Sequence, residues 1–332
     1  MIAVVTMRLL SLGAGVQSTV LALMACSGEL PGLDGAVFAD TGWEPPAVYA
    51  QVDRLAVEFE RAGIPLHRVS SGNLRVDTLD PDRRFVSVPY FTLAPEGTMV
   101  RDEITETDDN GHTVIVRYSE PRPATLRERQ GMGRRQCTSE YKLKPINRAV
   151  RILLGAPAPK YRRVPKGQVA EQWIGFSVDE IHRVNDRQEN AYTLKRYPLL
   201  ELGMSRKDCQ RWLVAAGWGH TAKSACIGYP FHGNAQWRDM RDNRPAEWAD
   251  AVEFDRRIRK DGASAAPLNG EAFLHSSRVP LDQAPIDRVT RKEWAERQLD
   301  IFDDLAEHGD PDGCSPYGCR SGTPLPVNEK AA

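Results

Sequence analysis

Short apolar segments alternate with longer amphipathic segments near the start of the chain, and this alternation constrains the fold more than any other feature. Residues 7–12, 35–40 and 65–70 have the length and apolar character of buried strands. Residues 16–27 and 45–63 have the length of helices; Gly28 follows the first of these segments and Gly63 ends the second. Strand, helix, strand, helix, strand predicts an α/β fold with a doubly wound parallel sheet and right-handed crossovers. Ligands of such sheets bind beyond the carboxyl ends of the strands.

The rest of the chain predicts an insertion and a helical C-terminal region. Residues 72–125 break the alternation, and MVRDEITETDDNGHTVIVRYS (99–119) is typical of a hairpin that turns at Asp-Asn-Gly. The 332 residues exceed one ordinary compact core, so we expect a domain at 1–200 and a mainly helical region at 201–332. Further elements are expected as a strand at 172–176 and helices at 139–154, 205–217, 245–260 and 290–307.

Charge, hydropathy and cysteine spacing narrow the class of protein. No apolar run approaches the roughly 18 residues of a membrane span, and Arg8 follows the first apolar segment instead of preceding it, which favours a cytoplasmic protein. The six cysteines are far apart, so thiol or metal chemistry is expected ahead of a disulfide framework. Residues 122–166 hold thirteen Lys and Arg against two acids, which suits a nucleic acid or an anionic nucleotide, or else a solvated basic face.

The segment SLGAGVQST (11–19) joins the first expected strand to the first expected helix. Gly13 and Gly15 allow a tight turn with N–H groups aimed at an anion, and Ser18 and Thr19 add hydroxyl donors at the helix N-terminus. The Lys of a Walker A loop is absent. The alternative is an ordinary strand–turn–helix junction.

The segment FADTGWEPPAVY (38–49) places Asp40, Thr41 and Gly42 at the end of the next strand. The Asp40 carboxylate can accept a hydrogen bond from ribose or adenine, or hold Mg²⁺. Its alternative role is to cap the following helix.

Two later segments, RRQCTSEYKLKPINRAVR (134–151) and WIGFSVDEIHRV (173–184), complete a set of four motifs. In this order the set resembles the PP-loop ATP pyrophosphatases, in particular the phosphoadenylyl-sulfate (PAPS) reductase-like branch, over roughly residues 8–185. Gln17 stands where many members have Asp, and Gly13 where they have Ser. The resemblance implies an adenine nucleotide α-hydrolase-like fold that binds ATP with Mg²⁺.

The resemblance and the side-chain chemistry together nominate the site. As catalytic residues we expect Asp40, Cys137 and Arg183. The residues expected to bind the nucleotide are Ser11, Gly13, Ala14, Gly15, Gln17, Ser18, Thr19, Asp40, Thr41, Gly42, Arg135 and Lys142. The basic members of this set neutralise phosphate charge.

The cysteines suggest a second cofactor. Basic neighbours are expected to lower the pKa of Cys137. SACIGYPFH (224–232) resembles a Ser-x-Cys-x-x-Cys-Pro segment of phage and bacterial relatives, with Tyr229 at the second Cys position. Cys137, Cys226, Cys314 and Cys319 supply the four thiolates of a [4Fe–4S] cluster, with unmodified thiols or a zinc site as alternatives.

The expected function is adenylation of a substrate by ATP with release of pyrophosphate, followed by sulfur transfer to DNA or tRNA. The resemblance includes the DNA phosphorothioation sulfurtransferase component, and implies nucleic acid and a cysteine desulfurase or other sulfur donor as partners. One alternative is a PAPS or APS reductase, although the terminal Glu-Cys-Gly segment of those enzymes is absent. The other is a non-catalytic nucleotide- or nucleic-acid-binding module, which Gln17 favours. The oligomeric state is open and includes a homodimer.

Overall fold

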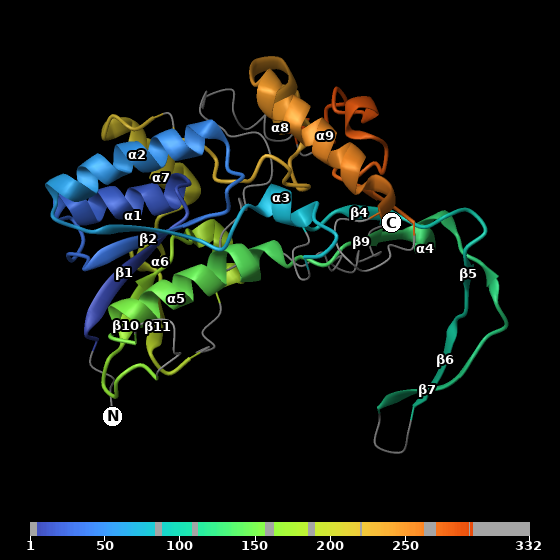
Figure 1. The fold of residues 1–332 in the computed structure, drawn as a ribbon, viewed down its shortest axis with the longest axis horizontal. Helices are drawn as coiled ribbons and strands as arrows, with labels where there is room; N and C mark the ends of the chain where they lie inside the picture. The colour runs from blue at the N-terminus through green and yellow to red at the C-terminus, as the bar shows by residue number, and fades with distance from the viewer. Residues whose placement is uncertain are drawn as a thin grey trace, which may run out of the picture.

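A parallel sheet of five strands forms the centre of the protein. The computed structural model describes residues 5–83, 88–107, 112–156, 163–184, 190–219, 221–261, 270–291 and 293–294. The strands β1 (Met7–Leu12), β2 (Gly35–Asp40), β3 (Leu66–Ser70), β10 (Ala170–Trp173) and β11 (Thr193–Arg196) lie in the order β11-β10-β1-β2-β3, and every neighbouring pair is parallel (Figure 1). The predicted α/β character and parallel sheet are confirmed. The fourth strand begins and ends earlier than predicted, and the short basic strand β11 was not predicted.

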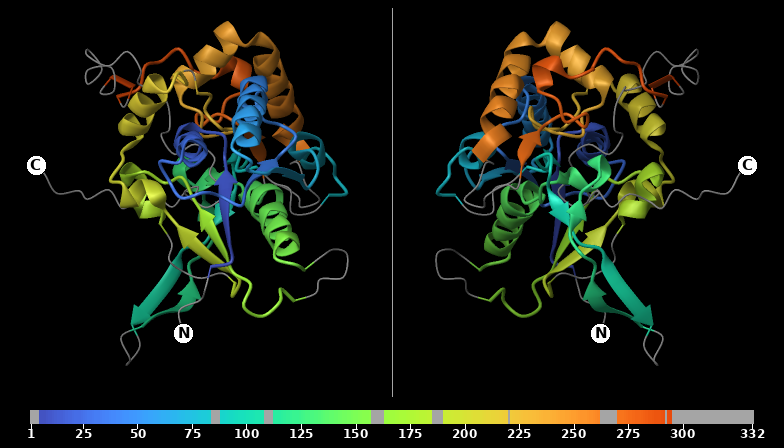
Figure 2. Two further views of the ribbon diagram at one scale, coloured as in Figure 1. Left: turned by 90° about the vertical axis from the view of Figure 1, so that its left-hand side faces the viewer. Right: turned by 90° about the vertical axis from the view of Figure 1, so that its right-hand side faces the viewer.

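Helices pack on both faces of this sheet (Figures 1 and 2). On one face, α1 (Val16–Ser27), α2 (Pro46–Arg61), α6 (Pro198–Glu201) and α7 (Arg206–Ala215) share a core with Leu10, Phe38 and Trp173. On the other face, α5 (Lys144–Leu153) packs on Leu9 and Val37. Consecutive strand residues point to opposite faces, so the near-continuous apolar runs of β1 and β2 follow from burial on both sides.

The predicted insertion forms a second layer together with the C-terminal region. The strands β4 (Phe91–Leu93), β9 (Gln130–Met132) and β12 (Glu271–Phe273) form an antiparallel sheet in the order β12-β4-β9. A second apolar core joins α8 (Asn234–Asn243) and α9 (Pro245–Asp261) to residues of the insertion such as Leu74 and Tyr90. The remaining short helices are α3 (Leu74–Thr78), α4 (Leu126–Arg129), η1 (Thr138–Leu143), η2 (Val178–Arg183) and η3 (Leu281–Gln283).

The hairpin predicted at 99–119 is confirmed as β6 (Glu103–Thr107) paired antiparallel with β7 (Thr113–Tyr118). Its predicted turn at 108–111 lies outside the described residues, as does almost all of the helix predicted at 290–307. Ser205 caps α7 as expected, because its hydroxyl accepts from the Asp208 N–H. Within the described part of the chain, none of the helices has the length and apolarity needed to cross a membrane.

Candidate functional site

The loop between β1 and α1 lies at the carboxyl end of the central strand. Ala14 has a φ of 55° and is completely buried, whereas Gly15 has a φ of −96°. Gly15 therefore does not supply a left-handed backbone, and a Cβ placed on it would lie at an ordinary contact distance, 3.5 Å, from the Cβ of Ser224. The Gly15 N–H donates to Ser18 Oγ at 3.2 Å, so Ser18 closes the first turn of α1.

Gln51 of α2 holds this loop in place, a role that was not predicted from the sequence. Its amide nitrogen donates to the carbonyl oxygen of Ala14 at 2.8 Å and to Thr19 Oγ1 at 2.9 Å. Its amide oxygen accepts from the Ala222 N–H at 2.6 Å. Thr19 is completely buried, and its hydroxyl oxygen accepts this hydrogen bond from Gln51. One side chain thus ties the loop to α2 and to the 221–226 segment.

Gln17 belongs to a buried polar group on the β10 side of the loop. Its amide nitrogen donates to Glu180 at 3.0 Å, and its amide oxygen accepts from Arg206 at 3.3 Å. Glu180 also pairs with Arg183, whose guanidinium lies 4.6 Å above the ring of Phe176. A glutamine can both donate and accept here, whereas an aspartate could only accept. Gln17 therefore suits this carboxylate neighbour.

The Asp40-Thr41-Gly42 turn follows β2, next to the loop in the sheet order. Asp40 Oδ1 accepts from the Gly42 N–H at 2.7 Å and from the Tyr49 hydroxyl at 2.8 Å. Burial and the hydrogen bond to Asp40 raise the pKa of Tyr49 above its usual range. Gly42 has a φ of 69°, and its carbonyl oxygen accepts from Asn73 at 2.8 Å. The turn is therefore fixed from both sides.

A buried ionic cluster lies behind this turn. Glu44 Oε1 accepts from Thr41 Oγ1 at 3.1 Å and from Cys226 Sγ at 3.6 Å, and it lies 3.4 Å from Lys142 Nζ. All four side chains are at least nine-tenths buried. Glu44 Oε2 has no hydrogen-bond partner among the described residues. Burying an ion pair while one of its acceptor atoms has no partner costs free energy.

Ser224 faces the loop from the opposite wall. Its hydroxyl is buried and has no hydrogen-bond partner within the described chain. A buried hydroxyl without a partner costs free energy, and it lies beside Gly15, where an anion on the loop would accept from it.

His232 supports the same segment. Its Nε2 lies 3.2 Å from the carbonyl oxygen of Cys226, which can only accept, and its Nδ1 lies 3.3 Å from Gln236 Oε1. A neutral ring with its proton on Nε2 fits the contact with Cys226. Burial, and then the charge of Lys223, lower the pKa of His232 to about 3. The lowered pKa favours a neutral ring at neutral pH.

The predicted cysteine ligands are only partly within the described structure. Cys137 and Cys226 are both buried and belong to one apolar cluster. Cys314 and Cys319 lie outside the described residues. Among the residues that are described, no group of three or more His, Cys, Asp or Glu is arranged to hold a metal ion. The iron–sulfur cluster and its alternatives therefore stay predictions.

The predicted basic residues lie in different settings. Lys142 belongs to the cluster with Glu44, and Arg183 pairs with Glu180. Arg135 donates from Nε to Thr138 at 3.1 Å and lies 6.0 Å above the Tyr229 ring. Ser11 is buried at the end of β1. The predicted loop follows β1 and the Asp40 turn follows the neighbouring strand β2, so both lie at one edge of the sheet. Tyr49 and Glu44 contact the turn, and Gln51 and Ser224 contact the loop; none of the four was assigned from the sequence.

Comparisons with protein-family models, with curated proteins and with solved structures find no match to this chain.

Proposed function

We propose that this chain is a doubly wound, PP-loop-type enzyme that binds ATP and adenylates a substrate with release of pyrophosphate. The observation that carries the proposal is the close approach of the segment after β10 to the first turn of α1, where the strand order reverses. The chain passes from β1 to β2 and β3 on one side and returns to β10 and β11 on the other. Where β1 and β10 lie side by side, Gly175 follows β10, and a Cβ on Gly175 would lie 3.0 Å from the Ser18 nitrogen at the start of α1. Such a reversal point is where α/β sheets bind nucleotides.

Each neighbouring group has a role in this proposal. The 13–15 loop, the N-terminus of α1 and the Ser224 hydroxyl receive the phosphates. Asp40 is the residue that would hold Mg²⁺, which supplies charge neutralisation on the phosphate oxygens. Lys142 adds positive charge from the neighbouring buried cluster.

The proposed reaction places an acceptor oxygen in line with the bond between the α- and β-phosphates. Attack at the α-phosphorus forms the adenylate and expels pyrophosphate, and a sulfur nucleophile then displaces AMP. The basic residues of 122–166 support DNA or tRNA as the acceptor, with a cysteine desulfurase or another donor supplying the sulfur. We place this activity in the cytoplasm.

The test is pyrophosphate release from ATP by the full chain purified without oxygen, with and without DNA or tRNA. Asp40→Asn is expected to lower the rate by about a hundredfold if Asp40 holds the metal. Asp53→Asn is the matched control, because Asp53 lies on the outer side of α2 and pairs with Arg68 at 2.5 Å. Absence of ATP binding would overturn the proposal. Thioredoxin-dependent sulfite release from PAPS would assign the chain to the reductases instead.

A further inference from the structure

A cavity of about 430 Å³ opens where the helices α1, α2 and α7 end, and the proposed nucleotide chemistry does not use it. We call it the three-helix cavity; α1 packs against both of the other helices (Figure 1). Each helix is followed within two residues by a glycine with a left-handed backbone: Gly28, Gly63 and Gly217. Because α1 and α2 begin at the carboxyl ends of β1 and β2, the cavity lies at the other end of the sheet from the proposed nucleotide site.

One of the two tryptophans that line the three-helix cavity already carries a cation. The guanidinium of Arg54 lies 3.6 Å from the centre of the Trp218 ring and donates to the carbonyl oxygen of Gly217 at 2.9 Å. Trp218 itself is buried. Indole rings attract cations more strongly than the other aromatic side chains do. The wall therefore has the chemistry of a cation site.

The second tryptophan, Trp212, is joined to a carboxylate of the same wall. Its Nε1 donates to Glu29 Oε2 at 3.3 Å, and Ser27 Oγ donates to Glu29 Oε1 at 3.0 Å. Both partners of Glu29 are uncharged, so they position the carboxylate without neutralising it. An indole and a negative charge thus lie side by side at the cavity.

Glu58 and the three helix ends add further negative potential. Glu58 pairs with Arg61, the one basic residue of the cavity wall, at 3.0 Å, and the Arg61 side chain is 70% exposed. Burial, and then the charge of Glu58, raise the pKa of the Cys26 thiol to about 11, so this part of the wall stays uncharged at neutral pH. The C-terminus of each helix carries a partial negative charge, and here three of them meet.

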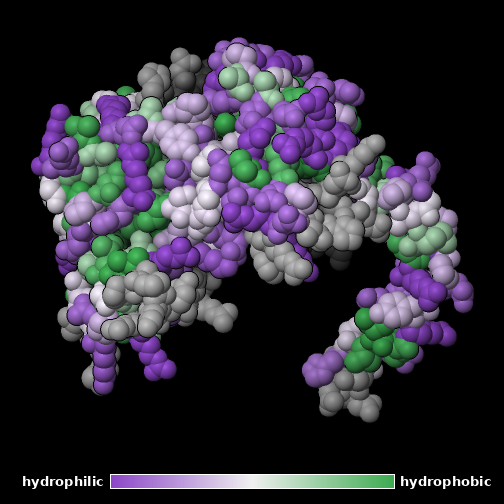
Figure 3. Space-filling view, viewed as in Figure 1, coloured by the Kyte–Doolittle hydropathy of each residue, from purple (hydrophilic) through white to green (hydrophobic). Residues whose placement is uncertain are grey.

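A second exposed apolar surface lies on a β-ribbon, and it differs from the cavity in shape. We call residues 99–107 and 112–123 the arm; β5 (Met99–Val100) pairs there with β8 (Arg122–Pro123), and β6 pairs with β7. Figures 1 and 2 show the arm projecting from the body, and apolar side chains gather on it (Figure 3). Every residue of β7 is exposed. A small ligand would stay largely in water there, whereas a cavity buries most of its surface.

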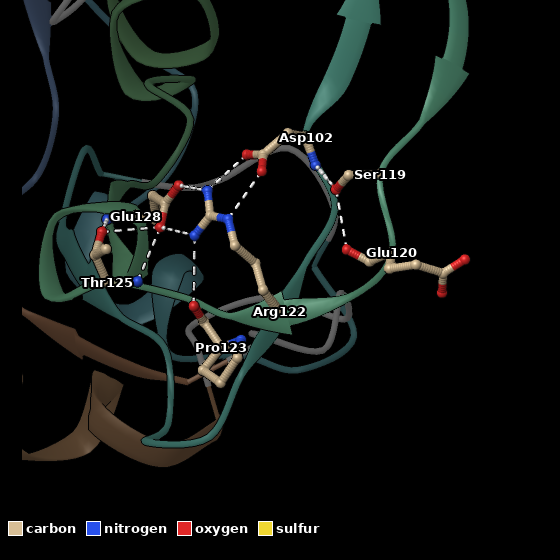
Figure 4. A network of polar contacts seen from close by, with 7 residues as sticks. All are labelled: Asp102, Ser119, Glu120, Arg122, Pro123, Thr125 and Glu128. Carbon is tan, nitrogen blue, oxygen red and sulfur yellow. Dashed lines mark hydrogen bonds and ion pairs between the residues drawn. The ribbon is translucent and has the colours of Figure 1, made fainter.

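The carboxylates at the root of the arm are already paired (Figure 4). Arg122 donates to both oxygens of Asp102, at 2.8 and 2.6 Å, and to both oxygens of Glu128, at 3.0 and 2.7 Å. One guanidinium therefore neutralises much of the charge of this pair. A further cation is attracted less strongly here than beside Glu29.

We propose that the three-helix cavity binds a small alkylammonium ion, with its charged group beside Glu29 and its hydrocarbon chain against the rings of Trp212 and Trp218. Such an amine is protonated at neutral pH, as lysine is. An anionic ligand would instead meet two carboxylates and the negative ends of three helices. The volume lies within the range of small-molecule sites. This inference does not depend on the proposed enzymatic function.

The test is titration of the full chain with n-hexylammonium chloride, followed by NMR of the indole N–H signals of its seven tryptophans. Trp212→Phe identifies the signal of Trp212. In the wild type this signal is expected to shift to saturation with a dissociation constant of about 1 mM or below. Hexanol and hexanoate have the same hydrocarbon chain without the positive charge, and each is expected to bind at least about tenfold more weakly.

Glu29→Gln removes the charge beside Trp212 and is expected to weaken binding of the amine by about fivefold. Glu60→Gln is the matched control, since Glu60 is exposed on α2 and is not part of the cavity wall. Ile115→Ser on the arm is likewise expected to change nothing. Equal weakening by Glu29→Gln and Glu60→Gln would overturn the proposal, and so would a loss of binding in Ile115→Ser.

Two further outcomes would also overturn the proposal: a Trp212 signal that stays in place throughout the titration, or hexanol that binds as tightly as the amine. The lysine side chain of a partner protein carries the same charged group, so the peptide Gly-Lys-Gly is titrated in parallel. Weaker binding of the peptide than of hexylammonium is expected for a site that takes a free amine. Tighter binding of the peptide would assign the cavity to a protein partner instead.

Discussion

Polar side chains at the candidate site hold backbone segments together, and Gln51 does so at three points. It contacts the Ala14 carbonyl, the Thr19 hydroxyl and the Ala222 N–H. Removing the amide would leave these three groups, two of them buried, without this partner, and each missing bond costs free energy.

Gln51→Ala is expected to lower the free energy of unfolding by about 2 kcal/mol and to weaken ATP binding by about tenfold, because the loop loses its support. Urea denaturation and titration calorimetry measure the two effects. Gln172→Met is the control, since the amide nitrogen of this buried glutamine has no partner among the described residues. Equal effects from the two variants would contradict the role given to Gln51.

The buried pair of Lys142 and Glu44 allows a second prediction. Lys142→Met leaves Glu44 as an uncompensated buried charge and is expected to destabilise the protein by about 3 kcal/mol. Adding Glu44→Gln to this variant is expected to restore much of the stability but not pyrophosphate release, because the positive charge stays absent. Recovery of activity in the double variant would show that Lys142 is only structural.

His232 gives the protein a defined dependence on pH. Its folded-state pKa of about 3 lies below the ordinary histidine value, so the unfolded chain binds the proton more readily. Stability is therefore retained above about pH 6.5 and falls as the pH drops toward 3, with a loss of roughly 2 kcal/mol by pH 5. His232→Gln is expected to flatten this part of the curve in denaturation experiments. An unchanged slope would contradict burial of a neutral ring.

At the scale of elements, the approach of β10 to α1 shapes the proposed phosphate site. Gly175 follows β10, and a Cβ there would meet the backbone of Ser18 and Gln17 at 3.0–3.2 Å. Gly175→Ala is expected to displace the first turn of α1 and to weaken ATP binding by about tenfold. Gly32→Ala is the control, because a Cβ at Gly32 would meet nothing within 4 Å. Calorimetry of both variants decides whether this contact matters.

Across the whole molecule, the proposed ligand site joins segments from distant parts of the chain. ATP with Mg²⁺ is therefore expected to slow hydrogen exchange together in 13–19, 40–44 and 221–226, while exchange in the arm stays unchanged. Mass spectrometry of peptides from these segments measures the effect. Protection confined to one segment would contradict a shared site.

The alternation of apolar segments was sufficient to predict the parallel sheet, because burial on both faces leaves a local pattern in each strand. The same pattern located the 13–15 loop and the Asp40 turn at the carboxyl ends of β1 and β2. The hairpin at 99–119 was predictable from its turn residues and alternation.

Only the tertiary structure decided how these parts are joined. Gln51 contacts Ala14, 37 residues away in the sequence, and Ser224 lies beside Gly15, more than 200 residues away. A local sequence pattern cannot predict contacts between residues so far apart. The pairing of Glu44 with Lys142 and Cys226, and the exposure of β7, likewise depend on how separate elements pack. The sequence by itself determined the local elements, since backbone conformation and burial act over a few residues. The site depended on the fold, since its groups meet only when the chain has closed long loops to bring them together.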